Sequence, residues 1–253
     1  MYPHSLLWHY LWIAPHIFTT VIVWLLIRHR LTREFPFFLA YCICQVIEQP
    51  ILFVLDHDPR ISGSTYWTTY SFMLVLQIAL RFCVIYELFS HMFDPYPGLQ
   101  ELGRRLLKWT AVILILLAAL FSGLNPGEQG DHVFSGISIL NRAVGLIQSG
   151  LLIILFLSAS SLRLSWRSYT FGIATGLGLY SSVGLVTDAM RVWMGIGVGT
   201  YFLDFVVMAA YHCSVVIWIA YLLAPEPARV LPAELPETNM TQWNAELQRL
   251  LLQ

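Results

Sequence analysis

The sequence predicts an all-α, polytopic membrane protein: a seven-transmembrane-helix bundle with its N-terminus outside and its C-terminus in the cytoplasm. Hydrophobic residues make up 57% of the chain and charged residues only 11%, whereas soluble domains carry about 45–50% apolar and about 25% charged residues. The apolar residues gather in stretches of about 20, the length with which a helix crosses a bilayer. Lys and Arg are frequent in every second connection and rare in the others, as they are in cytoplasmic and external loops.

Seven stretches are long and apolar enough to form spanning helices, and together they make the predicted bundle of residues 1–223. Turn residues such as Asn125-Pro126-Gly127 separate the fourth and fifth stretches, and Pro36 can start the second. The seven stretches cover residues 6–27, 37–55, 66–89, 106–122, 136–158, 169–190 and 201–223.

The basic residues of the short connections predict the orientation. The second, fourth and sixth connections contain only Arg60 and Arg191. Since cytoplasmic loops are enriched in Lys and Arg, the other three connections are predicted to be cytoplasmic, in a multi-pass protein of the cell inner membrane. Their basic residues are Arg28, Arg30, Arg33, Arg104, Arg105, Lys108, Arg163 and Arg167.

The composition changes after residue 223. Residues 224–240 contain four prolines and are predicted to form an extended cytoplasmic linker. In residues 241–253 apolar residues recur at helical spacing and form a stripe, and Thr241 is a suitable N-cap. This pattern predicts a short amphipathic helix that lies on the inner leaflet or docks on the bundle or on a partner protein. The stripe consists of Trp243, Leu247, Leu250 and Leu251.

Ionisable side chains inside the predicted spans are the candidate functional residues, because charged groups are costly at membrane depth. A rise of about 1.5 Å per residue places them at mid-depth or toward the outside. Glu48 and Arg142 are predicted to pair within a polar cavity open to the outside. A purely structural network of ion pairs and hydrogen bonds is the competing interpretation. The ligand-binding candidates are His16, Glu48, Arg142, Asp188, Asp204 and His212.

Two further polar residues lie on the third predicted helix. Gln77 lies near its middle and Arg81 in its cytoplasmic half. They are candidates for a cytoplasmic gate or a contact with a partner. An arginine that extends its side chain to the inner interface is the competing interpretation of Arg81.

The sequence argues against a retinal pigment and offers little for a metal. Retinal forms a Schiff base with a lysine amine, and the one lysine, Lys108, lies at the inner end of the fourth stretch. Catalytic zinc needs three protein ligands, and the chain has no HxxxH pair, so no metal site is predicted. Haem bound between His16 and His212 remains an alternative, since both lie at mid-depth.

Small residues recur every fourth position on the sixth predicted helix. Gly172, Gly176 and Tyr180 share one face, with Ala174, Gly178 and Ser182 beside it. Such spacing lets two helices approach closely in lipid. We interpret it as packing within the chain rather than as a dimer contact.

Three short segments together resemble a group of uncharacterised bacterial seven-helix membrane proteins of the acidobacterial type. The resemblance covers most of the chain and implies the topology only, with no activity and no functional residues. The segments are Arg33-Glu34-Phe35-Pro36, Ser165-Trp166-Arg167, and the run from Ala210-Tyr211-His212-Cys213 through Trp218 to Leu223-Ala224-Pro225.

The leading functional hypothesis is a non-enzymatic, receptor-like protein with an outward-facing polar cavity that senses or binds a small ligand. The alternatives are a small-solute or ion transporter or channel, although the chain shows no convincing internal repeat, and an accessory subunit of a larger membrane complex. A haem-binding redox protein comes after these. The predicted partners are the lipid bilayer and a protein reached through the C-terminal helix. The net charge of −1 argues against nucleic acid.

Overall fold

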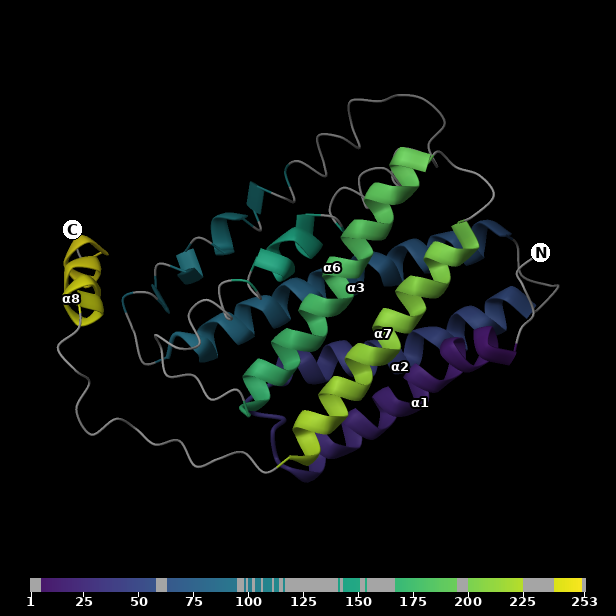
Figure 1. The fold of residues 1–253 in the computed structure, drawn as a ribbon, viewed down its shortest axis with the longest axis horizontal. Coiled ribbons are helices and arrows are strands. Elements are labelled where there is room, and N and C mark those ends of the chain that lie inside the picture. Colours follow the sequence, from purple (N-terminus) through teal and green to yellow (C-terminus); the bar gives the residue numbers. More distant parts are fainter. Residues whose placement is uncertain are drawn as a thin grey trace.

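The regular structure of the described residues is entirely helical (Figure 1). The helices are α1 (Leu6–Arg28), α2 (Pro36–His57), α3 (Gly63–Met92), α6 (Tyr169–Met194), α7 (Thr200–Leu223) and α8 (Asn239–Leu251). The computed structural model describes residues 6–57, 63–94, 98, 100–101, 103–105, 107–110, 112–113, 116, 141, 143–150, 153, 167–194, 200–224 and 239–251.

Five of the described helices, α1, α2, α3, α6 and α7, are long and apolar enough to cross a membrane. They confirm five of the seven predicted stretches, with ends that differ by a few residues. The chain is therefore an α-helical protein with several membrane-span candidates. The fourth and fifth stretches, 106–122 and 136–158, fall largely outside the described residues, as do Arg142 and most of the linker.

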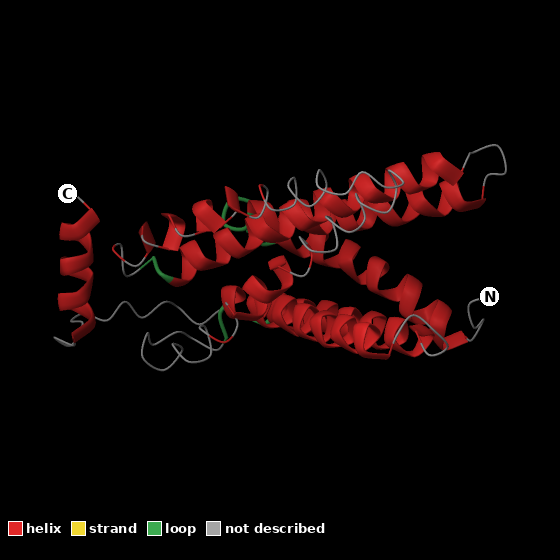
Figure 2. Cartoon of the chain, turned by 90° about the horizontal axis from the view of Figure 1, so that it is seen from above, coloured by secondary structure: helices red, strands yellow, loops and turns green. Residues whose placement is uncertain are grey.

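The five long helices form a closed ring. Along the ring, α3 packs on α2, α2 on α1, α1 on α7 and α7 on α6, and a contact between α6 and α3 completes it. Figure 2 shows these helices running along the long direction of the molecule, with α8 standing across one end. The first and seventh predicted helices are thus neighbours, which brings His16 and His212 into one interface.

Aromatic side chains pack inside the ring where α7 ends and α2 begins. The indole of Trp218 on α7 is 1% exposed and meets the ring of Phe38 on α2 edge to face, with 5.2 Å between centroids. Its Nε1–H donates a hydrogen bond to the carbonyl oxygen of Ile173 on α6 at 3.2 Å. Trp218 therefore connects α2, α6 and α7, and burial of its polar atom is compensated by the backbone acceptor.

Helices α6 and α7 approach closely through glycine. A Cβ placed on Gly172 would lie 2.5 Å from Cβ of Tyr221, and one on Gly176 would lie 2.8 Å from Cδ1 and Cε2 of Trp218. Neither position has room for a side chain. The predicted packing of small residues within the chain is thus confirmed at Gly172 and Gly176.

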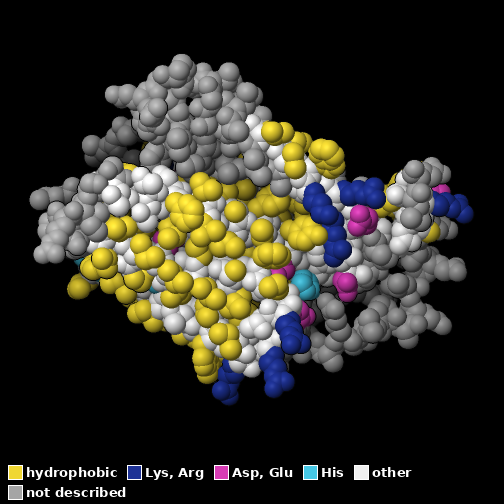
Figure 3. Space-filling model, turned by 180° about the vertical axis from the view of Figure 1, so that it is seen from behind, with side chains coloured by type: hydrophobic (Ala, Val, Ile, Leu, Met, Phe, Trp, Pro, Cys, Tyr) yellow, Lys and Arg dark blue, Asp and Glu magenta, His cyan; other side chains and the backbone are white. Residues whose placement is uncertain are grey.

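Apolar side chains cover the outer surface of the ring. Large residues such as Ile17, Ile47, Phe72 and Phe202 are half or more exposed. Figure 3 shows a broad apolar face, with Lys and Arg side chains at its right and lower edges. An apolar surface of this extent is expected in lipid rather than in water.

The C-terminal helix α8 begins at Asn239, two residues before the predicted N-cap Thr241, and ends at Leu251. Helix ends are weakly specified by sequence, which accounts for the difference. α8 contacts the segment that follows α3, because the backbone N–H of Gly98 donates to Oδ1 of Asn244 at 2.7 Å. Trp243 and Leu250 of its apolar stripe remain exposed.

Candidate functional site

A group of polar side chains meets inside the ring near its mid-depth. On α2 and α3, the Nε2 amide of Gln45 donates to the hydroxyl of Tyr41 at 3.1 Å and to Oε1 of Gln77 at 2.8 Å. Gln45 is buried, so these bonds replace the water that its amide would otherwise bind. We call this group the central cluster; it comprises Thr19, Tyr41, Gln45, Gln77, Arg81, Asn141, Tyr180 and Tyr211.

Arg81 supplies the positive charge of the central cluster. It is 6% exposed, and one of its Nη atoms donates to Oδ1 of Asn141. Its Nε is buried without a hydrogen-bond partner, and no carboxylate of the described residues pairs with it. A guanidinium does not lose its proton in a protein, so this charge stays in the bundle. The low exposure of Arg81 and its bond to Asn141 place the guanidinium among protein groups.

The cluster continues onto α1, α6 and α7. The hydroxyl of Thr19 donates to the carbonyl oxygen of Pro15 at 2.7 Å and lies 3.3 Å from the hydroxyl of Tyr211. The Tyr211 ring packs against Tyr180, with 5.6 Å between centroids. Both tyrosines lie near Tyr41. The polar atoms therefore run across the ring from α3 to α1.

The depth of the central cluster follows from its places along the helices. Gln77 lies at the middle of α3, Tyr211 at the middle of α7 and Gln45 close to the middle of α2. Arg81 lies one turn, roughly 6 Å, further along α3 toward the end at Met92. The cluster is thus nearest to the midplane of the spanning segments, where a polar group is most costly unless it is satisfied.

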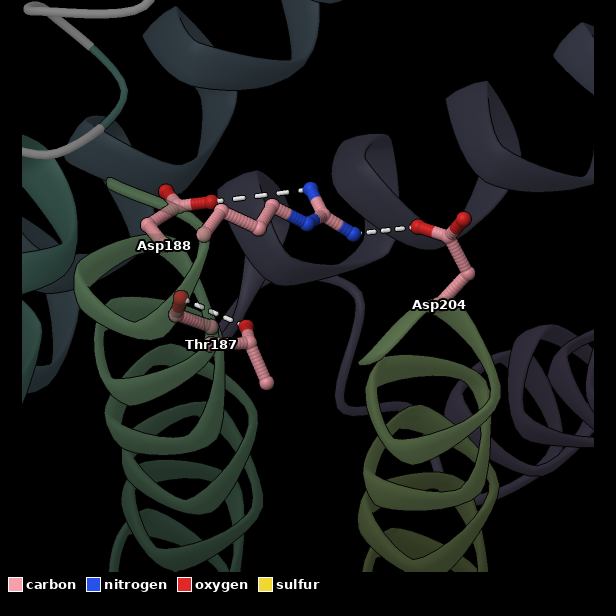
Figure 4. Close-up of polar contacts among 5 residues, drawn as sticks. Thr187, Asp188 and Asp204 are labelled. Carbon is pink, nitrogen blue, oxygen red and sulfur yellow. Dashed lines mark hydrogen bonds and ion pairs between the residues drawn. The ribbon is translucent and has the colours of Figure 1, made fainter. Parts of the chain in front are cut away.

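Arg191 lies near the end of α6 and pairs with the two predicted aspartates. Its guanidinium donates to Asp204 of α7 and lies 3.7 Å from Asp188 of α6 (Figure 4). All three side chains are between about a quarter and two-fifths exposed. Ion pairs this exposed contribute little to stability. Arg191 bridges Asp188 and Asp204 where α6 ends and α7 begins, and neither aspartate pairs with His16.

Glu48 and the two histidines are not brought to one point. Glu48 is buried, with its Oε2 unpaired among the described residues. Its predicted partner Arg142 lies outside the described residues, so the pair stays a prediction. The His16 ring packs on Tyr211, with 6.0 Å between centroids. The His212 ring packs instead on Phe18 and Tyr10, and its Nε2 lies 3.4 Å from the Tyr10 hydroxyl.

The same two histidines are the candidate haem ligands. His16 and His212 sit in the direct contact between α1 and α7, with aromatic side chains against both rings. This packing gives no support to a haem held between them. Within the described part of the chain, no three His, Cys, Asp or Glu side chains gather in a way that would hold a metal ion.

Glu87 on α3 is a polar residue whose role the sequence did not reveal. It is 4% exposed, and its two carboxylate oxygens accept hydrogen bonds from the backbone N–H groups of Phe37 and Phe38, both at 3.0 Å. These are free N–H groups in the first turn of α2. A negative charge there also faces the positive end of the helix dipole. Glu87 therefore fixes the start of α2 against α3.

The fold and the central cluster define a class, the α-helical membrane proteins with several spanning segments and a polar interior. Comparison with known families, with curated proteins and with solved structures finds no match to this chain.

Proposed function

We propose that this chain is a non-enzymatic ligand-binding membrane protein that holds a small organic anion, of the carboxylate class, at the central cluster. One observation carries the proposal: Arg81 is buried at membrane depth with a neutral amide as its hydrogen-bond partner. A buried charge without a counter-charge costs several kcal/mol, by order of magnitude. Because arginine stays protonated, an anion is the available means of offsetting this cost.

The neighbours of Arg81 suit a carboxylate. A guanidinium presents parallel N–H groups that bind a carboxylate with two hydrogen bonds. The amides of Gln77 and Asn141 and the hydroxyl of Tyr41 supply further neutral hydrogen-bonding groups around it. A site with one positive charge and neutral polar walls favours an anion with a single carboxylate over a dianion. Sensing follows if binding shifts the packing of α3 against α2 and α6.

We expect carboxylates to stabilise the wild-type protein and to have no such effect on Arg81→Met. An anion that binds only the folded state raises its apparent stability by about 2.7 kcal/mol at a hundredfold excess over Kd. The measurement is thermal unfolding of the purified protein in detergent, with a series of monocarboxylates and their neutral amides. The amides should leave the melting temperature unchanged.

The Arg81→Met variant also tests the folding of the empty site. Replacing a buried charge by an apolar side chain of similar size is often neutral or stabilising, so this variant should unfold no earlier than the wild type without anion. Arg105→Met removes an exposed charge paired with Glu101 and serves as the matched control that keeps the anion response. The anion site would be refuted if carboxylates and amides raised the melting temperature equally, or if carboxylates raised that of Arg81→Met as much as that of the wild type.

A transporter is the second candidate, and the depth of the central cluster favours it. Transporters bind their substrates near the midplane of the membrane, between packed helices. Flux of a carboxylate that stabilises the protein, measured in liposomes and lost in Arg81→Met, would move this candidate ahead of sensing. Stabilisation without flux would favour sensing.

We also propose the seven-span topology, with the N-terminus outside and the C-terminus inside, in the inner membrane. The end of α1, the beginnings of α2 and α6 and the segment after α3 carry or adjoin most of the basic residues, including Arg28 and Arg167. Reporter fusions after Arg30, Arg105, Arg167 and Gln253 are expected to report cytoplasm. Fusions after Pro59, Gly127 and Gly197 should report the outside. If two or more fusions reported the side opposite to the one expected, the seven-span topology would be wrong.

A further inference from the structure

A groove opens between α1 and α2 on the outer surface of the ring. It encloses about 390 Å³ and is lined mainly by apolar side chains, among them Trp12 and Ile17 on α1 and Phe53 on α2. These three side chains are more than one-third exposed, so the groove faces the surroundings of the bundle rather than its interior. A volume of this size lies in the range of small-molecule sites.

Both walls of the groove also carry a polar side chain without a hydrogen-bond partner among the described residues. The imidazole of His16 lines it from α1 and makes no hydrogen bond to a described residue; its Nδ1 is buried away from the groove, which leaves Nε2 as the ring nitrogen that can face a bound group. The carboxamide of Gln49 lines it from α2, and the structure pairs it with no described residue. Water is scarce at this depth, so unsatisfied polar groups there cost several kcal/mol each, by order of magnitude. Two of them on facing walls indicate a bound group that satisfies both.

Depth in the membrane restricts what that bound group is. His16 lies near the middle of α1, with roughly 15–18 Å of helix on either side. The charged headgroup of a phospholipid would lose its hydration at this depth, at a cost that two neutral side chains do not offset. A neutral polar group on an apolar molecule reaches it from the lipid phase.

We propose that this groove binds a neutral lipophile whose ring carries carbonyl or hydroxyl groups, the chemistry of a quinone. His16 and Gln49 each donate or accept a hydrogen bond, so they pair with a ring carbonyl or with a ring hydroxyl. Trp12 and Phe53 offer aromatic faces for the ring, and the opening toward lipid accommodates the tail. The site is separate from the central cluster and does not rest on an anion binding there.

The test uses the full chain in lipid nanodiscs, titrated with decylbenzoquinone, with quenching of tryptophan fluorescence as the readout. Quinone dissolved in lipid quenches in proportion to its concentration, whereas a bound quinone adds a saturable component. We expect that component in the wild type, and we expect Trp12→Phe to lose most of it. Decylbenzene has the same tail without the oxygens and should give no saturable binding and no rise in melting temperature.

Two variants separate binding from folding. His16→Leu and Gln49→Leu should each weaken the saturable component at least tenfold, while their melting temperatures without quinone stay at or above that of the wild type, since each removes an unpaired polar group. Phe202→Leu on the exposed face of α7 is the control that keeps wild-type binding. Purely linear quenching in the wild type, or unchanged binding in both leucine variants, would overturn the proposal.

Discussion

Gly176→Val is expected to destabilise the bundle more than any other single change that we propose. A Cβ at this position would lie 2.8 Å from Cδ1 and Cε2 of Trp218. The indole cannot yield, because it is 1% exposed, bonded to the carbonyl of Ile173 and wedged against Phe38. Forcing extra volume into such a contact costs about 1–3 kcal/mol and at times more, so we expect a loss at or above the upper end of that range.

Gly184 provides the matched control on the same helix. No atom outside its local backbone lies within 4 Å of a Cβ built there, so Gly184→Ala meets open space. Alanine is favoured over glycine in a helix interior by about 1 kcal/mol. The two substitutions should thus have opposite signs when thermal unfolding is followed in detergent. If Gly176→Val and Gly184→Ala both left the melting temperature unchanged, the close contact between α6 and α7 would be wrong.

The positions of the described spanning helices could be predicted from sequence because length and hydropathy determine them. The predicted stretches 169–190 and 201–223 correspond to α6 (Tyr169–Met194) and α7 (Thr200–Leu223) with small differences at the ends. The contact of Gly172 and Gly176 with α7 was likewise predictable as close packing, although its partner helix was not. The spacing of small residues predicts that another helix packs closely on that face, but it does not predict which helix.

The central cluster was only partly predictable, because neutral polar residues do not stand out in an apolar helix. Gln77 and Arg81 were identified as polar residues at depth, but Tyr41, Gln45 and Tyr211 were not. The spanning helices are apolar on every face, so their sequences do not show which side is interior and which faces lipid. Gln45 and Gln49 illustrate this: they lie one turn apart on α2, yet one joins the central cluster and the other lines the groove.

Charge was also a poor guide to which residues meet. The sequence grouped Asp188 and Asp204 with Glu48, whereas the structure joins them to Arg191, which the sequence assigned to an external connection. The capping role of Glu87 was not predictable for a similar reason. Its partners are backbone N–H groups about 50 residues earlier in the chain, and no side-chain pattern records such an interaction.

Glu87→Gln is the second change with a large expected effect. The carboxylate of Glu87 accepts from the N–H groups of both Phe37 and Phe38, whereas a glutamine amide has one oxygen and would turn its NH2 toward the other donor. Hydrogen bonds to charged groups are each worth about 1.5–3 kcal/mol, and a buried donor left unpaired costs about 1–3 kcal/mol. We expect a loss of about 2–3 kcal/mol by these values, measured by thermal unfolding.

Glu101→Gln is the control that separates capping from loss of charge. Glu101 is 49% exposed and pairs with Arg105 one turn away at 3.2 Å, and an exposed pair of this kind is worth about 0.3–0.5 kcal/mol. Hydrogen exchange adds a local readout: the amides of Phe37 and Phe38 should exchange faster in Glu87→Gln and at the wild-type rate in Glu101→Gln. Equal melting temperatures for the two variants, with unchanged exchange at the start of α2, would show that Glu87 does not hold that helix in place.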